Sequence, residues 1–227
     1  MEHISTGSAQ HDTSAETLKV LRNTYMLLSM TLAFSALTAG ISMSVNLGSG
    51  AAAMMSIAAI VLVWFVLPRT ANTAMGLPVV FLLTGLLGAA LGPMLNRYLA
   101  LQNGSEMVMQ ALGGTAIVFM SLSAYVLTTK KDFSFLGGFL FSGLIVVIVG
   151  MVGAMIAASF FGVDVAFFSL VMSGVIVLLM SGLILFDTSR IINGGETNYI
   201  MATVSLYLNI YNMFTALLHI IGAISDD

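Results

Sequence analysis

The chain contains no cysteine and few charged residues, and each of these shortages excludes a class of function. Without cysteine there are no disulfides, no zinc–thiolate sites and no thiol nucleophile. Only three histidines are present, and His3 and His11 lie in a polar N-terminal segment, so we expect no metal site built from several histidines. Charged residues make up 7% of the sequence, seven basic against ten acidic, which is not the composition of a nucleic-acid-binding protein.

Apolar residues are abundant instead. They make up 59% of the 227 residues and the mean hydropathy is +1.04, whereas soluble domains contain roughly 45–50% apolar residues. A chain of this composition has to be surrounded by apolar solvent. We therefore predict an integral membrane protein whose first partner is the lipid bilayer.

Seven apolar runs are long enough to cross about 30 Å of hydrocarbon as helices. We predict an all-α, polytopic fold in which residues 19–227 form a seven-helix transmembrane domain with the polar seventh helix at its centre. Residues 1–18 are polar and lack an apolar period, which predicts a disordered cytoplasmic tail. The predicted spans are residues 24–45, 51–67, 78–98, 106–127, 135–161, 165–186 and 199–224.

Residues that start or stop helices lie between these runs. Pro68 is expected to end the second helix, and Gly194 is expected to end the sixth in a left-handed conformation. Ser105 and Asp164 are expected to cap the fourth and sixth helices at their N-termini.

The basic residues predict the orientation of the chain. With the N-terminus in the cytoplasm, six of the seven basic residues fall on the cytoplasmic side and only Arg97 falls on the other. This asymmetry predicts a periplasmic C-terminus. The six are Lys19, Arg22, Arg69, Lys130, Lys131 and Arg190.

Small residues recur at helical spacing in the third and fifth runs. Gly85, Gly88 and Gly92 follow one face of the third, and Gly150 and Ala154 are four apart in the fifth. Because lipid provides no hydrophobic drive between helices, close approach through small residues supplies packing energy. This pattern predicts a tightly packed helical bundle.

Asp187 is an ionisable residue at the end of the sixth apolar run, and such residues are unusual in a membrane. A structural interpretation pairs it with Arg190 on the same helix face, or with Arg69 at another cytoplasmic helix end. A functional interpretation places its carboxylate at the cytoplasmic mouth of a polar cavity, where it binds a cation or titrates.

The seventh run has a polar stripe. Ser205, Asn209, Asn212 and His219 recur at intervals of four, three and seven, which keeps them on one helical face. This helix should therefore face protein rather than lipid. Either its asparagines hydrogen-bond neighbouring helices, or they line a polar conduit gated by Asp187. His219 is more readily explained as a satisfied interfacial residue than as a sensor.

No enzyme motif is present. The chain lacks the HExxH, GxSxG and GxxxxGK[ST] patterns. Intramembrane proteolysis would need a Ser/His pair or two spanning aspartates, and only Asp187 comes near this requirement. We therefore expect a protein that is not an enzyme and needs no cofactor. If calcium binds at all, we expect a weak site at Asp187.

Several segments, in this order, resemble the Bax inhibitor-1 (TMBIM-like) family. The resemblance extends from about Leu18 to the C-terminus and is most specific where the last two spans join. The segments are KVLRNTYMLLSMTLAFSALTA, LGPMLNRYL, GGTAIVFMSLSAYVLTTKKDFSFLGG and FDTSRIINGGETNYIMATVSLYLNIYNMF.

The resemblance implies two functions. In one, family members form a pH-sensitive calcium leak controlled by two aspartates. Asp187 matches the first aspartate, but Asn209 in LYLNIYN replaces the second. Two close carboxylates titrate as a coupled pair, whereas an Asp–Asn pair does not. Asparagine also removes a charge from a site for a hard cation. We therefore expect a weaker and less pH-dependent calcium effect, or none.

The other implied function concerns proteolysis. One branch of the family consists of bacterial inner-membrane proteins that bind the membrane-anchored AAA+ protease FtsH and its HflK/HflC partners. They restrain the protease by being slow substrates. Such a protease pulls on an exposed end, which residues 1–18 would provide. We favour this function because Asn209 breaks the aspartate pair. The calcium leak is the alternative, and a solute transporter would require a substrate-sized cavity.

Overall fold

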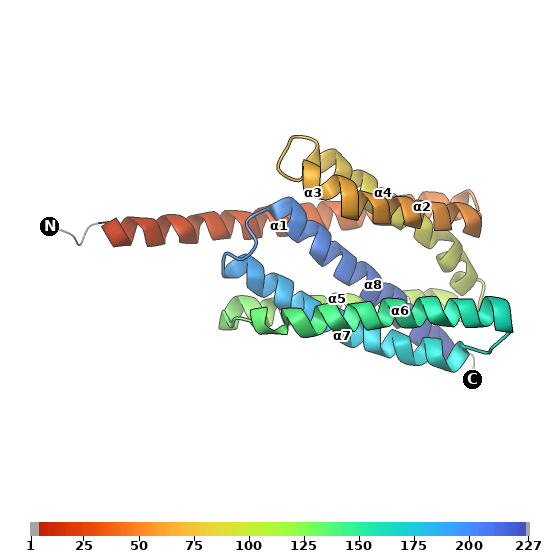
Figure 1. The fold of residues 1–227 in the computed structure, drawn as a ribbon. Coiled ribbons are helices and arrows are strands. Elements are labelled where there is room, and N and C mark those ends of the chain that lie inside the picture. Colours follow the sequence, from red (N-terminus) through yellow and green to blue (C-terminus); the bar gives the residue numbers. More distant parts are fainter. Residues whose placement is uncertain (1–4, 226–227) are drawn as a thin grey trace. The chain divides into compact units, whose positions relative to one another are not determined.

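A computed structural model describes the backbone of residues 5–225 and the side chains of residues 15–225. Within this part of the chain every regular element is a helix (Figure 1). Two short elements are the π-helix η1 (Leu62–Val66) and the 3-10 helix η2 (Ser134–Leu136). The α-helices are α1 (Ser5–Ser44), α2 (Ser49–Val61), α3 (Leu67–Thr70), α4 (Gly76–Leu99), α5 (Gly104–Thr129), α6 (Gly137–Phe161), α7 (Ala166–Ile192) and α8 (Tyr199–Ser225).

Seven helical segments of the described residues are long and apolar enough to cross a membrane. Their number and order confirm the prediction of an all-α polytopic membrane protein with seven transmembrane helices. The boundaries differ from the predicted ones by a few residues at most ends. The segments are Ala15–Ser44, Ser49–Thr70, Gly76–Leu99, Gly104–Thr129, Ser134–Phe161, Ala166–Ile192 and Tyr199–Ser225.

The N-terminal segment differs from its prediction. Helix α1 begins at Ser5, so residues 5–18 are helical where we expected a disordered tail. The segment contains no proline, and a helix already nucleated by the adjoining span adds a backbone hydrogen bond for each further residue. Residues 1–4 of the predicted tail lie outside the described residues. The cytoplasmic location of the tail stays a prediction.

The second span does not end at Pro68, which corrects another expectation. The helix instead widens into the π-helix η1 and continues through α3 to Thr70. Proline lacks an N–H and its ring clashes with the carbonyl of the residue four positions earlier. In the wider turn the Leu67 N–H bonds to the Leu62 carbonyl, five residues back. The Arg69 guanidinium donates to the Phe65 carbonyl.

The predicted helix ends are partly correct. The Asp164 carboxylate accepts the Ala166 N–H at 2.9 Å, just before α7 begins, and Gly194 has a φ of 74° after α7 ends. The expectation for Ser105 is wrong, because α5 begins at Gly104 and its N-cap is Asn103, with a left-handed φ of 62°. Asparagine tolerates that conformation better than most residues.

The chain packs as two compact units. Unit 1 consists of Met1–Leu101 and Arg190–Tyr207, and unit 2 of Gln102–Ser189 and Leu208–Asp227. Helices α7 and α8 contribute residues to both units. Helix α8 supplies residues 199–207 to unit 1 and residues 208–225 to unit 2. The central position that we expected for α8 stays a prediction, but many of its residues from Ile200 to Leu218 are buried in protein, as expected.

Unit 1 is built on close contact between α1 and α4. A side chain at Gly88 would lie 2.3 Å from the Ser35 carbonyl oxygen, and one at Gly92 would lie 2.1 Å from the Ser42 hydroxyl. These positions therefore exclude any Cβ atom. They confirm the prediction that the glycines of the third span allow close helix packing.

Unit 2 contains α5, α6, α7 up to Ser189 and α8 from Leu208. Its core joins Leu140 of α6, Ile184 of α7 and Met213 of α8, and residues of α5 pack against it. Figure 1 shows α5, α6 and α7 running side by side. Gly143 faces Leu179 and Gly182 faces Leu140, so each glycine admits a leucine from the opposite helix. The rest of α6 is largely exposed and apolar, as expected for a lipid-facing helix.

Candidate functional site

The centre of the candidate site is a hydrogen bond between α7 and α8 within unit 2. Asn209 Nδ2 donates to Asp187 Oδ2 at 2.7 Å. Helix α7 continues past Phe186 because no glycine or proline interrupts it before Gly194, and this places Asp187 in its last turns. Asn209 is 5% exposed and Asp187 is half-buried. The structure thus brings together the two residues that the sequence singled out first.

The chemistry of this pair is that of a carboxylate bound by a neutral donor. The amide N–H group satisfies one carboxylate oxygen in a charge-assisted hydrogen bond. A cation at the same oxygen would compete with this bond, because an amide that presents its nitrogen cannot serve as an oxygen ligand. Among the described side chains, residues 15–225, no three His, Asp or Glu groups gather to hold a metal. A calcium role for Asp187 stays a prediction.

Arg190 and Arg69, the two predicted partners of Asp187, both have contacts within unit 1, and their pairing with Asp187 stays a prediction. Arg190 forms an ion pair with Glu196 at 3.5 Å, and its guanidinium also donates to the Gly195 carbonyl at 3.1 Å. Arg69 donates to the Phe65 carbonyl. The ion pair is partly exposed, so its contribution to stability is on the order of 1 kcal/mol or less. Sequence reasoning missed Glu196.

Asn198 organises the connection between α7 and α8 in unit 1. Its side-chain oxygen accepts the N–H groups of Ile200 at 2.8 Å and Met201 at 3.1 Å, which caps α8. Its Nδ2 group donates to the Ala71 carbonyl at 3.0 Å and to Asn72 Oδ1 at 2.7 Å. The start of α8 is thereby joined to the segment between α3 and α4. An asparagine directly before an apolar run was the signal that could have revealed this cap.

The remaining members of the polar stripe have separate partners. Asn212 donates to the Leu208 carbonyl of its own helix at 2.8 Å, and His219 Nδ1 lies 3.0 Å from the Ser173 hydroxyl. Ser205 is half-buried and belongs to unit 1, whereas the other members belong to unit 2. Asn209 and His219 thus hydrogen-bond the neighbouring α7, whereas Asn212 bonds within α8. The polar conduit stays a prediction.

The Ser173–His219 contact is a serine–histidine pair, but its geometry does not favour a nucleophile. The Ser173 hydroxyl also donates to the Ser169 carbonyl at 2.9 Å. With its proton held there, the hydroxyl oxygen accepts from the imidazole, so the histidine acts as donor rather than as base. The pair is a structural contact between α7 and α8.

Tyr207 is a buried polar residue that sequence reasoning left aside because it lies off the stripe. Only 1% of its surface is exposed. Its hydroxyl lies 2.7 Å from Ser35 Oγ and 3.3 Å from the Thr84 carbonyl oxygen, so it joins α8 to α1 and α4 in unit 1. A buried tyrosine hydroxyl normally finds such partners. The signal in the sequence was a tyrosine between two leucines, Leu206 and Leu208, which is weak.

The connection between α5 and η2 is bound to the end of α7 in unit 2. The Phe133 N–H donates to Ser189 Oγ at 2.8 Å, and Ser189 Oγ lies 3.3 Å from the Lys131 carbonyl oxygen. Asp132 lies outside the spans. Hydrogen bonds from the Ser134 side chain and backbone lower the pKa of its carboxyl below the usual 3.8.

Comparison with known proteins agrees with the architecture. A family model described as "Inhibitor of apoptosis-promoting Bax1" matches residues 17–226. A Vibrio cholerae membrane protein is 50% identical over 222 residues, which are 98% of this chain and 97% of the relative. A protein of Escherichia coli K12 named "Modulator of FtsH protease YccA" is 48% identical over 227 residues, the full length of both chains. A protein of Escherichia coli O6:H1 named "Inner membrane protein YccA" has the same identity and coverage.

Proposed function

Because the chain belongs to the Bax inhibitor-1 family, we propose that it binds the membrane-anchored protease FtsH and restrains it as a slow substrate in the inner membrane. The observation that supports this most directly is the match with the Escherichia coli modulator of that protease. The two proteins are 48% identical over the full length of both, so they share the terminal segments as well as the spans. The HflK/HflC partners of the protease would belong to the same assembly.

The N-terminal segment suits this function. A pulling protease needs an end that it can grip and unwind. Residues 5–18 extend α1 beyond the predicted start of the first span, and this polar extension offers few apolar side chains for packing. The positive-inside rule predicts that this end lies in the cytoplasm.

Deleting residues 2–15 from the full chain tests the proposal. The deletion removes most of the segment that the protease would grip and leaves Thr24, Ser35 and Ser42 of α1 in place. We expect the shortened protein to co-purify with the protease as the full chain does, while its half-life becomes several-fold longer in a pulse-chase measurement. Unchanged turnover, or loss of co-purification for both chains, would contradict the proposal. The Lys131→Ala variant, changed in a connection of unit 2, is the matched control.

A cation leak is the second candidate function. The observation in its favour is an ionisable carboxylate on a membrane-spanning helix, Asp187, in direct contact with the residue that replaces the family's second aspartate. Calcium flux into proteoliposomes at about pH 6 and about pH 8 tests it. Flux that Asp187→Asn abolishes would establish the leak. A silent wild type that Asn209→Asp makes permeable would mean that this chain retains the scaffold without the pore.

A further inference from the structure

Hydrogen bonds hold α1 against α4 and α8 between Thr24 and Ser42. At one end Thr203 Oγ1 of α8, which donates to the Tyr199 carbonyl of its own helix at 2.7 Å, also lies 3.3 Å from the Thr24 carbonyl oxygen. Near the middle Ser35 Oγ lies 2.7 Å from the Tyr207 hydroxyl. At the other end Ser42 Oγ donates to the Ala89 carbonyl of α4 at 2.6 Å. We call this set of contacts the α1 interface. All of it lies within unit 1.

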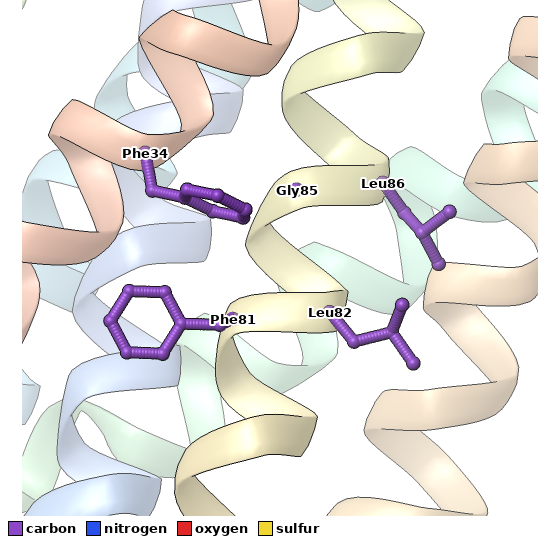
Figure 2. A pocket seen from close by; sticks show the side chains of 5 residues that line it. All are labelled: Phe34, Phe81, Leu82, Gly85 and Leu86. Carbon is purple, nitrogen blue, oxygen red and sulfur yellow. The ribbon is translucent and has the colours of Figure 1, made fainter.

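Shape complementarity adds to these hydrogen bonds. Gly88 and Gly92 bring the α4 backbone so close to α1 that a Cβ atom at either would overlap Ser35 or Ser42. Nearer the start of α4, the Phe34 ring occupies the space that a side chain at Gly85 would need (Figure 2). The same ring meets the Phe81 ring edge-on, with the two ring centroids 5.5 Å apart.

Two other spans are held less firmly by the protein than α1 is. In the Ser134–Phe161 span, which contains α6, 6% of an apolar 18-residue stretch is buried, and in the Ser49–Thr70 span 17%, against 33% for the span of α1. Lipid surrounds much of the first two. A pulling protease that starts at the N-terminus meets α1 before them. Since α1 is one unbroken helix from Ser5 to Ser44, force on its first residues is transmitted directly to the interface.

From these contacts we infer that the α1 interface is the mechanical barrier that makes the chain a slow substrate, an inference that rests on the proposed function. Drawing α1 out of the membrane separates the hydroxyls of Ser35 and Ser42 from their partners while they are surrounded by apolar groups. Unpaired polar groups there are unfavourable, so the separation slows extraction. Restraint of the protease then depends on α1 remaining in place.

Degradation rates of full-length variants by the membrane-reconstituted protease test the inference. Two variants weaken the α1 interface: Gly92→Ala, and Ser35→Ala combined with Tyr207→Phe. We expect both to be degraded about five to thirty times faster than the wild type. A modest loss of stability raises the ratio of unfolded to folded protein by about this factor. Co-purification with the protease should be unchanged.

Two control variants separate the interface from general stability. Gly182→Ala crowds Leu140 in unit 2, where a Cβ atom would lie 2.6 Å from the leucine side chain. Gly138→Ala changes an open position of α6 with no atom within 4 Å. Thermal unfolding without protease ranks all four variants by stability. We expect Gly182→Ala to lower the melting temperature but leave the degradation rate within about twofold of the wild type.

The outcomes separate this inference from the proposed function. If Gly182→Ala accelerates degradation as much as an equally destabilised α1-interface variant, or if the interface variants are degraded at the wild-type rate, the interface is not the barrier. If the wild type neither co-purifies with the protease nor is degraded by it, the proposed function itself fails. Acceleration confined to the α1-interface variants supports the inference.

Discussion

The identity of residue 209 decides the electrostatics around Asp187. Asparagine donates a hydrogen bond to the carboxylate at 2.7 Å and carries no charge of its own. Aspartate at this position would place two carboxylates in contact, and two such groups titrate as a coupled pair. In this protein a neutral amide is instead bound to a single carboxylate. The pair contains one titratable group, so the coupled titration of two carboxylates does not arise.

Removing the donor should destabilise the protein. In Asn209→Leu the Asp187 carboxylate loses the amide hydrogen bond inside unit 2, and a hydrogen bond to a charged group contributes roughly 1.5–3 kcal/mol. We expect a lower melting temperature in detergent at neutral pH. Asp187→Asn serves as the control because it keeps two amides that can bond each other, so its loss should be smaller. Equal melting temperatures for Asn209→Leu and the wild type would contradict the role of this bond.

Asp132 offers a titration outside the membrane. Its folded pKa lies below the usual 3.8 because Ser134 donates to the carboxylate, with the backbone bond at 2.8 Å. A lowered pKa means that the ionised form stabilises the fold above the ordinary pKa. This contribution is lost as the pH falls through the folded value.

Carbon-13 NMR of labelled aspartate carboxyls can measure this titration. We expect the Asp132 signal to titrate below 3.8 in the wild type and closer to that value in Ser134→Ala, which removes the side-chain donor. Ser142→Ala changes an exposed serine that donates to its own helix and should leave the Asp132 pKa unchanged. A wild-type Asp132 signal that titrates at or above the usual value would show that the hydrogen bonds from Ser134 to Asp132 are not formed.

Among the elements, α4 and α6 show how the same residue type serves two purposes. Gly88 and Gly92 of α4 lie against α1, where a Cβ atom has no space. At Gly138 and Gly153 of α6, an added Cβ atom would meet no other atom within 4 Å. In the first pair glycine permits packing, and in the second it only adds freedom to the unfolded chain.

Substituting these glycines should therefore have opposite effects. Gly88→Ala forces α1 and α4 apart and should lower the unfolding free energy by about 1–3 kcal/mol. Gly153→Ala should leave it unchanged or raise it by about 0.4–1 kcal/mol, because alanine reduces the entropy of the unfolded chain. Chemical denaturation in detergent, followed by circular dichroism, measures both. Similar losses for the two variants would contradict the assignment of the α1–α4 contact.

In the molecule as a whole, function depends on which end of each span faces the cytoplasm. The basic residues predict that the connection at 130–133 is cytoplasmic and the one at 100–103 periplasmic. The absence of native cysteine makes this testable, because every thiol signal then comes from an introduced residue. Lys131 and Gln102 are both exposed and suit such substitutions.

Labelling with a membrane-impermeant maleimide should distinguish the two sides. In spheroplasts we expect Gln102→Cys to react at once and Lys131→Cys to react only after permeabilisation, because the bilayer excludes the charged reagent. Reaction of both variants after permeabilisation is the control for accessibility. The reverse pattern would place the N-terminus outside and remove the protease's access to α1.

The sequence by itself determined the class of the protein, its seven spans and the residues of chemical interest. These properties are local, because hydrophobic length and the need to satisfy every backbone group within a helix do not depend on distant contacts. The same reasoning identified Asp187, Asn209 and the glycines of α4. It failed at Pro68 and at residues 5–18, where a π turn and continuation of an existing helix overrode the local signals.

Only the tertiary structure decided which of these residues meet. Asn209 binds Asp187 across 22 positions of the sequence, and Tyr207 reaches Ser35 across 172. Arg190 pairs with Glu196, a partner that the sequence did not suggest. Such choices depend on which helix faces are adjacent, and a helical period places a residue on a face without naming the face opposite. Polar side chains in lipid bond to whatever donor or acceptor packing brings within reach.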